Sequence, residues 1–123
     1  MKTIKVKEWD EIPKEYTGIV EYNNGDKKWY LNGKLHRIDG PACEYANGDK
    51  AWRLNGVLHR ENGPAVERFN GTKSWHLNGK HHRIDGPAVE WNNGDKAYYI
   101  NGVIVTKEAQ EVLYAMYKLK GLL

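Results

Sequence analysis

Side chains that could act as nucleophiles are scarce in this chain of 123 residues. Ser74 is its only serine and Cys43 is its only cysteine. In equivalent segments of the sequence, Ala51 stands where Ser74 does and Val66 stands where Cys43 does. This pattern predicts that Cys43 is a small buried residue and that Ser74 fills an ordinary variable position. Since a catalytic site needs one asymmetric set of different groups, we expect a protein that is not an enzyme.

Histidine is the remaining residue type that could hold a metal or transfer protons. His76, His81 and His82 crowd one segment, while Cys43 lies far away along the chain. Tetrahedral sites usually draw four ligands at tight spacing, so the signal for a site here is weak. The sequence therefore predicts no metal and no cofactor.

A second set of histidines recurs along the chain, each followed by arginine. The pairs are His36-Arg37, His59-Arg60 and His82-Arg83. A recurring pair is most simply structural, because a buried polar group must find a partner. We expect these side chains to form a ladder bonded to neighbouring turns or to Asp39 and Asp85.

The recurring pairs belong to a repeat of 23 residues that is marked by two sets of Asn-Gly. The glycines of the first set are Gly25, Gly48, Gly71 and Gly94, and those of the second are Gly33, Gly56, Gly79 and Gly102. Asn-Gly between strand-like runs is typical of hairpin turns with two positive φ angles. The repeat therefore predicts a meander of antiparallel strands, in which each Gly-Pro marks a bulge or kink.

The two ends of the chain have other patterns. Residues 1–16 predict one strand, over about 2–9, followed by a loop around Pro13. Residues 106–123 place apolar side chains at helical spacing, which predicts a helix over about 107–120.

The helix has signals at both of its ends. Thr106 is a suitable N-cap, and Gly121 suits the C′ position. We expect one domain over residues 1–123, with a repeat sheet at 17–105 that the C-terminal helix caps at one end. The expected fold class is all-β with a terminal helix.

The segments Trp29-x-x-Asn32-Gly33-Lys34-x-His36 and Ala46-Asn47-Gly48-Asp49, at a period of 23, resemble MORN repeats over residues 18–103. The family's Gly-Lys-x-x-Gly-x-Gly ending is replaced here by His-Arg-x-Asp-Gly-Pro-Ala, and the usual Tyr-x-Gly start is absent. This variant is similar to repeats in uncharacterised proteins of bacteriophages and giant viruses. The resemblance implies an elongated sheet that binds other proteins or itself. It also suggests a phage protein that binds and inhibits a host factor, of the anti-defence type.

The predicted faces of the sheet depend on loop length. Two-residue loops at every Asn-Gly would place Tyr45 opposite Lys50 and Cys43 opposite Trp52. Side chains alternate between faces, so Trp52 would share one apolar face with Cys43 and Tyr45, and Arg53 would lie on the other. A single sheet must cover such an apolar face, either by curling on itself or by packing against a second molecule, and of these we predict a homodimer.

Function is expected at positions that vary between copies, because residues that recur serve the fold. Tyr, Trp and Arg are enriched at binding hot spots, although strands also favour aromatic residues in general. The predicted partner-binding residues are Tyr30, Arg53, His76, Tyr99, Tyr45, Arg68 and Trp91. A further variable column holds Leu35, Leu58, His81 and Ile104.

The alternative function is an anion-binding surface for nucleic acid or acidic lipid. Its residues would be Arg37, Arg60, Arg83, Lys27, Lys50, Lys73 and Lys96. The net charge of only +3, and the lack of any run of consecutive basic residues, make this alternative the weaker one.

The compartment follows from segments that the sequence lacks. The first residues have no apolar run of the kind a signal peptide needs, and no stretch reaches the length of a membrane span. A lone cysteine cannot form an intramolecular disulfide. We expect no transmembrane segment and a cytoplasmic protein, in the host cytoplasm if a phage encodes it.

Overall fold

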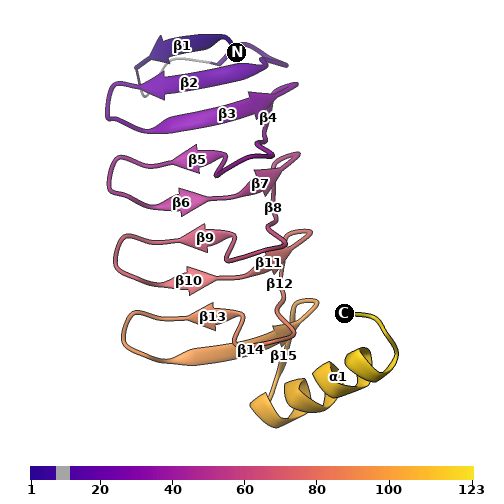
Figure 1. Ribbon diagram of the computed structural model, residues 1–123. Coiled ribbons are helices and arrows are strands. Elements are labelled where there is room, and N and C mark those ends of the chain that lie inside the picture. Colours follow the sequence, from indigo (N-terminus) through magenta and orange to yellow (C-terminus); the bar gives the residue numbers. More distant parts are fainter. Residues whose placement is uncertain (8–11) are drawn as a thin grey trace.

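The computed structural model of the chain describes residues 1–7 and 12–123. Its hairpins stack into a long strip, with the N-terminus at one end and the helix at the other (Figure 1). The main sheet holds eleven strands in the order β1-β2-β3-β5-β6-β9-β10-β13-β14-β15, with β4 beside β3. Two small sheets, β7-β8 and β11-β12, extend the hairpins. The predicted class, all-β with one terminal helix, is confirmed.

The strands are short, and most of them come in hairpins. The first are β1 (Thr3–Val6), β2 (Gly18–Tyr22), β3 (Lys27–Leu31) and β4 (Lys34–Leu35). The second repeat forms β5 (Cys43–Glu44), β6 (Lys50–Ala51), β7 (Arg53–Leu54) and β8 (Val57–Leu58). The third forms β9 (Val66–Glu67), β10 (Lys73–Ser74), β11 (His76–Leu77) and β12 (Lys80–His81). The last strands are β13 (Val89–Glu90), β14 (Lys96–Ile100) and β15 (Val103–Val105).

The second set of Asn-Gly pairs forms the predicted turns. Asn55 has φ 50° and Gly56 has φ 82°, and the other three pairs have nearly the same angles. Two positive φ angles in succession define the two-residue type I′ turn, which suits the twist of the flanking strands. Arg53 consequently faces Leu58 across the β7-β8 hairpin.

The first set of Asn-Gly pairs forms longer loops than predicted. At Gly48 only the glycine has positive φ, the Gly48 amide donates to the Tyr45 carbonyl, and the Tyr45 amide donates to the Asp49 carbonyl. The loop therefore has three residues and ends in a glycine bulge. The Asn47 side chain stabilises it by accepting a hydrogen bond from the Asp49 amide at 2.9 Å.

The extra loop residue shifts the pairing by one position and corrects the predicted faces. Cys43 lies opposite Ala51, and Glu44 lies opposite Lys50. A shift of one residue moves every side chain of a strand to the other face. The prediction that Cys43 and Tyr45 share a face with Trp52 is therefore wrong, and so is the single apolar face derived from it.

Two rows of side-chain hydrogen bonds join each repeat to the next. At one edge of the strip, Nδ1 of His36 accepts a hydrogen bond from the Asn55 amide at 2.9 Å, and His59 and His82 do the same one repeat further along. At the other edge, Asp26 accepts from the Ala46 amide at 2.8 Å. The predicted bonding of the recurring histidines to neighbouring turns is confirmed.

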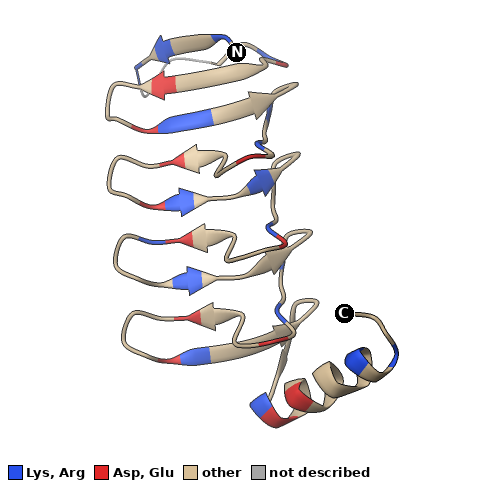
Figure 2. Cartoon of the chain, viewed as in Figure 1, with Lys and Arg blue, Asp and Glu red and all other residues tan. Residues whose placement is uncertain are grey.

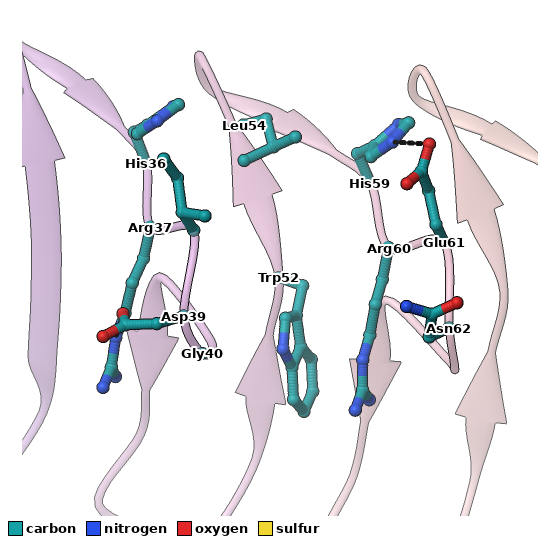
Figure 3. A pocket seen from close by; sticks show the side chains of 11 residues that line it. His36, Arg37, Asp39, Gly40, Trp52, Leu54, His59, Arg60, Glu61 and Asn62 are labelled. Atoms are coloured by element: carbon teal, nitrogen blue, oxygen red, sulfur yellow. Dashed lines mark hydrogen bonds and ion pairs between the residues drawn. The ribbon is translucent and has the colours of Figure 1, made fainter.

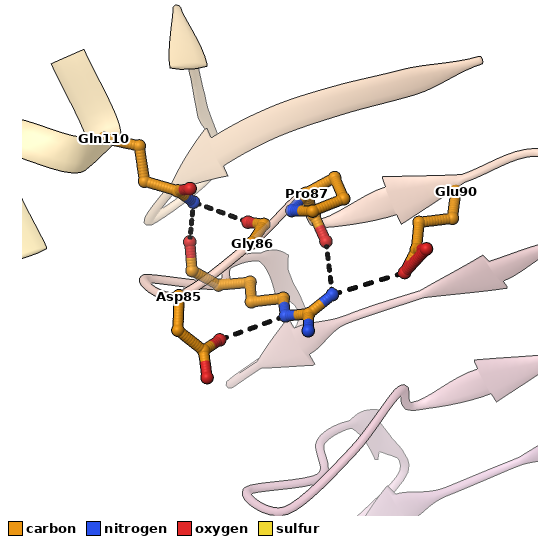
Figure 4. Close-up of polar contacts among 6 residues, drawn as sticks. Asp85, Gly86, Pro87, Glu90 and Gln110 are labelled. Atoms are coloured by element: carbon orange, nitrogen blue, oxygen red, sulfur yellow. Dashed lines mark hydrogen bonds and ion pairs between the residues drawn. The ribbon is translucent and has the colours of Figure 1, made fainter. Parts of the chain in front are cut away.

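Arginine organises the kinked segment that follows each recurring histidine. The Arg83 guanidinium lies 4.0 Å from the centre of the Trp75 ring. It donates hydrogen bonds to Asp85, to Glu90 and to the Pro87 carbonyl (Figure 4). Arg37 and Arg60 stack on Trp29 and Trp52 in the same way. A Cβ added at Gly86 would lie 2.7 Å from the Arg83 guanidinium carbon, which explains the recurring glycine.

The helix α1 (Lys107–Leu119) caps the last repeat, as predicted. The Thr106 hydroxyl accepts a hydrogen bond from the Ala109 amide, and Gly121 has φ 69°. Gln110 is buried and donates to the carbonyls of Arg83 and Gly86, so it closes the segment that no further repeat covers.

The opposite end of the strip departs from the meander. β1 pairs with β2 in parallel, whereas β2 and β3 pair in the antiparallel manner of the repeats. Val6 and Val20 pack there with Tyr16, whose hydroxyl donates to the Lys2 and Ile19 carbonyls. The predicted strand over residues 2–9 is observed as β1, and positions 8 and 9 lie outside the described residues.

Candidate binding surface

The register divides the strand residues between two faces of different character. The ladder face carries residue types that recur in each copy: Trp29, Trp52 and Trp75 with the stacked Arg37, Arg60 and Arg83, the lysines Lys27, Lys50, Lys73 and Lys96, and the glutamates Glu44, Glu67 and Glu90. The variable face carries residue types that change between copies. Its central column is Val20, Lys28, Cys43, Ala51, Val66, Ser74, Val89 and Ala97.

The seven predicted partner-binding residues all lie on the variable face. Arg53 flanks the central column on one side, as do Tyr30, His76 and Tyr99. Tyr45 flanks it on the other side, with Arg68 and Trp91 in the same position of later copies. The third variable column joins them, because Leu58 faces Arg53 and His81 faces His76. The prediction had split these columns between two faces.

Aromatic and thiol groups pack together in the first part of the variable face. The hydroxyls of Tyr22 and Tyr30 lie 3.4 Å apart, and the Lys28 ammonium lies 5.2 Å from the centre of the Tyr22 ring and 5.6 Å from that of Tyr45. Burial raises the pKa of Tyr45 to about 12 and also raises that of Cys43. Cys43 is fully buried, as predicted, so its thiol is a packing group.

Histidines and an arginine occupy the middle of the variable face. The His76 ring lies 4.2 Å from the His81 ring, which lies 5.0 Å from the ring of Tyr99. Burial, with the nearby His81 and Arg53, lowers the pKa of His76 to about 4. Nδ1 of His76, Nδ1 of His81 and Nε of Arg53 are buried and have no hydrogen-bond partner in the described structure.

One contact on this face has the composition of a nucleophile and its base. The Ser74 hydroxyl lies 3.0 Å from Nε2 of His76. An effective pair needs a base with a pKa near neutral and a third group that orients it. His76 has a pKa of about 4, and its Nδ1 contacts no orienting group among the described residues. The contact therefore lacks the features that make a serine nucleophilic.

The residues predicted for anion binding lie on the ladder face, where nearby carboxylates compensate their charge. Each recurring lysine is opposite a glutamate; Glu44, for example, lies between Lys27 and Lys50. Basic and acidic residues accordingly alternate from strand to strand (Figure 2). The arginines are paired too, with Arg37 3.3 Å from Glu44 and Arg60 3.6 Å from Glu67.

The ladder face also has shallow grooves between successive kinked segments. One of them has a volume of about 820 Å³, and Arg37 and Arg60 stand on either side of Trp52 and Leu54 in it (Figure 3). Arg37 and Arg60 each stack on a Trp ring and donate hydrogen bonds to a carbonyl of their own kinked segment. We therefore attribute the grooves to the spacing of the repeats and not to a ligand site.

The crowded histidines do not form one cluster. His82 points to the Asn101 amide, whereas His76 and His81 stack on the variable face. Within the described residues, no three His, Cys, Asp or Glu side chains are placed to hold one metal ion. No described helix has both the length and the apolar character needed to cross a bilayer.

Lys28 and Tyr22 are residues of this surface that the sequence analysis missed. Lys28 is the first-copy equivalent of Ala51 and Ser74, so its column varies as strongly as the predicted ones. The sequence analysis described the position of Ser74 as variable, but it did not include this column in the predicted binding surface.

Comparison with known proteins adds no further assignment. No family model, no curated protein and no solved structure matches the chain.

Proposed function

We propose that this protein is a non-enzymatic interaction scaffold that binds another protein through its variable face. The observation that carries the proposal is the separation of the two faces. The columns that differ between copies share one side of the sheet, and the recurring Trp, Arg, Lys and Glu residues share the other. Because the fold does not require a particular side chain at the variable positions, these positions can differ in the way that recognition of a partner needs.

The shape of the molecule supports the same function. Its accessible surface is 7952 Å², whereas a folded chain of 14.2 kDa has about 6,800 Å². A long strip offers much surface for its mass, as repeat scaffolds do. Trp91, which is 43% exposed, is a candidate anchor residue.

A capture experiment tests this function. The tagged chain would be incubated with lysate of its host, at low and at high salt, and the retained molecules identified by mass spectrometry. We expect one protein to be retained at both salts and to be lost when Tyr30, Arg53 and Trp91 are replaced by alanine. Alanine at Lys27, Lys50 and Lys96 on the ladder face is the matched control and should leave capture unchanged. Recovery of nucleic acid or lipid alone, lost at high salt, would instead support the anion-binding alternative.

The resemblance to MORN-like repeats extends the proposal. It suggests that the partner is a host factor, that the protein is a phage-encoded inhibitor, and that both act in the host cytoplasm. The homodimer also belongs to the proposal, because Val103 and Ile104 of β15, together with Val112 of α1, are at least 60% exposed. Light scattering at micromolar concentration should give twice the mass of the chain, and a monomeric mass would exclude the dimer.

A further inference from the structure

The two faces differ in charge as well as in variability. All carboxylates of the described strands, namely Glu21, Glu44, Glu67 and Glu90, lie on the ladder face, each opposite a lysine. The strands of the variable face carry Lys28 and Arg53 and no carboxylate, while Arg68 and Asp49 lie together at the edge of the face. The positive charges of Lys28 and Arg53 are therefore not balanced by a carboxylate of the described strands, although the recurring basic residues lie on the other face.

Two of these cations have no acidic partner in the described part of the chain. The Lys28 ammonium lies over the Tyr22 and Tyr45 rings, and Arg53 donates from Nη1 to the Gly56 carbonyl at 2.8 Å. Arg68 differs, since it lies 3.7 Å from Asp49 at the edge of the face.

Arg53 is the cation with the most unsatisfied donor capacity. It is half-buried, its Nε has no hydrogen-bond partner, and no carboxylate of the described residues lies within ion-pair distance. A guanidinium carries five N–H donors in a planar fork that matches a carboxylate. Tyr45, Arg53 and Arg68 line an open hollow of about 280 Å³, which Asp49 beside Arg68 also lines.

We propose that the variable face recognises an acidic protein segment, whose Asp or Glu carboxylates pair with Arg53 and Lys28. This rests on the proposed function and names the chemistry of its partner. Charge complementarity argues for it, because a carboxylate would supply the partner that both cations lack.

The same residues argue against single-stranded nucleic acid. Such binding needs open aromatic rings on which bases stack. Around Lys28, where the proposed partner binds, Lys28 covers the rings of Tyr22 and Tyr45, and Tyr30 packs edge-on against Tyr16 with 6.4 Å between ring centres.

Two neighbouring lysines provide a matched test. Lys27 and Lys28 are consecutive, both half-buried, and on opposite faces of β3. Binding of fluorescently labelled poly-L-glutamate to the full chain would be measured by anisotropy at low salt. We expect Lys28→Gln to weaken binding about fivefold and Lys27→Gln to leave it unchanged. Arg53→Gln should weaken it roughly tenfold or more; melting temperatures confirm that the variants are folded.

Three results would overturn the proposal: no binding of poly-L-glutamate by the wild type, equal weakening by Lys27→Gln and Lys28→Gln, or tighter binding of an oligothymidylate that depends on Lys28. None of them excludes protein binding by the variable face in general. That broader function would fail if Trp91→Ala and Tyr30→Ala left capture of the partner protein intact.

Discussion

The ladder face and the variable face are made by the same strands, yet they bury different kinds of group. On the ladder face, each Trp ring carries an arginine whose donors are taken by carboxylates and carbonyls, as for Arg83 with Asp85, Glu90 and Pro87. On the variable face, buried nitrogen atoms of Arg53, His76 and His81 have no partner in the described chain.

The difference indicates how one repeat can serve both folding and recognition. Buried polar groups are normally satisfied, so unsatisfied ones mark positions that are not optimised for the fold alone. Each copy keeps its Trp, Arg and Gly to hold the kinked segment. The position that is Tyr30 in the first copy is Arg53 in the second and His76 in the third, and the hairpin is the same in all three.

The largest expected difference between the faces concerns tryptophan. Trp29 on the ladder face is 7% exposed and lies under Arg37, whereas Trp91 on the variable face is 43% exposed. We expect Trp29→Ala to lower the free energy of unfolding by about 3 kcal/mol or more, and Trp91→Ala by less than about 1 kcal/mol. Denaturant titration measures both values, and equal losses would break the comparison.

The variable face should also make stability depend on pH through His76. Its pKa falls from 6.5 to about 4 in the folded chain because of burial, with smaller effects of His81 and Arg53. The unfolded chain therefore binds more protons between these values, and the free energy of unfolding decreases as pH falls through this window. The total loss is up to about 3 kcal/mol, and above pH 6.5 the contribution of His76 is complete.

The variant His76→Tyr isolates this effect, since Tyr30 and Tyr99 occupy the same column. Denaturant titrations of both proteins from pH 7 to pH 4 would be compared. As pH falls, the free energy of unfolding should decrease less for the tyrosine variant than for the wild type. A difference between the two proteins that stays constant with pH would contradict the assignment.

A smaller effect is expected from arginine. Arg60 stacks 3.8 Å from the Trp52 ring and donates to the Pro64 carbonyl at 3.0 Å, whereas Arg68 is a largely exposed side chain 3.7 Å from Asp49. Arg60→Lys should cost about 1–2 kcal/mol, because lysine cannot both stack and donate in a fixed plane. Arg68→Lys should change stability by less than about 0.5 kcal/mol. Thermal unfolding of the two variants measures these losses. Equal losses of stability for Arg60→Lys and Arg68→Lys would show that the ladder face does not depend more on its arginines than the variable face does.

The repeat pattern was sufficient to predict the hairpins, the type I′ turns and the helix, because Asn-Gly, Thr106 and Gly121 have strong local preferences. The faces were wrong because Asn-Gly occurs in loops of two lengths. The distinguishing signal is the Asp or Thr that follows, as in Asn47-Gly48-Asp49, whose amide bonds to the asparagine side chain. The two-residue turns of the second set were predicted correctly, and Leu35 and Leu58 lie opposite Tyr30 and Arg53.

Other features depend on contacts that no local pattern specifies. The parallel pairing of β1 with β2 places Val6 beside Tyr22, and the arginines stack on rings eight residues earlier in the chain, as Arg37 does on Trp29. The candidate surface was named residue by residue from variation between copies. Their position on one face could not be predicted, because it depends on the register that the three-residue loops set.

Tyr98 and Tyr99 allow the most direct measurement of which face binds a partner. They are neighbouring, half-buried tyrosines of β14 that point to opposite faces. A photoreactive benzoyl-phenylalanine would replace one or the other, and the chain would be irradiated in host lysate. A covalent adduct with a protein from the Tyr99 position alone is the predicted result. An adduct from the Tyr98 position alone, or equal adducts from both, would contradict the account.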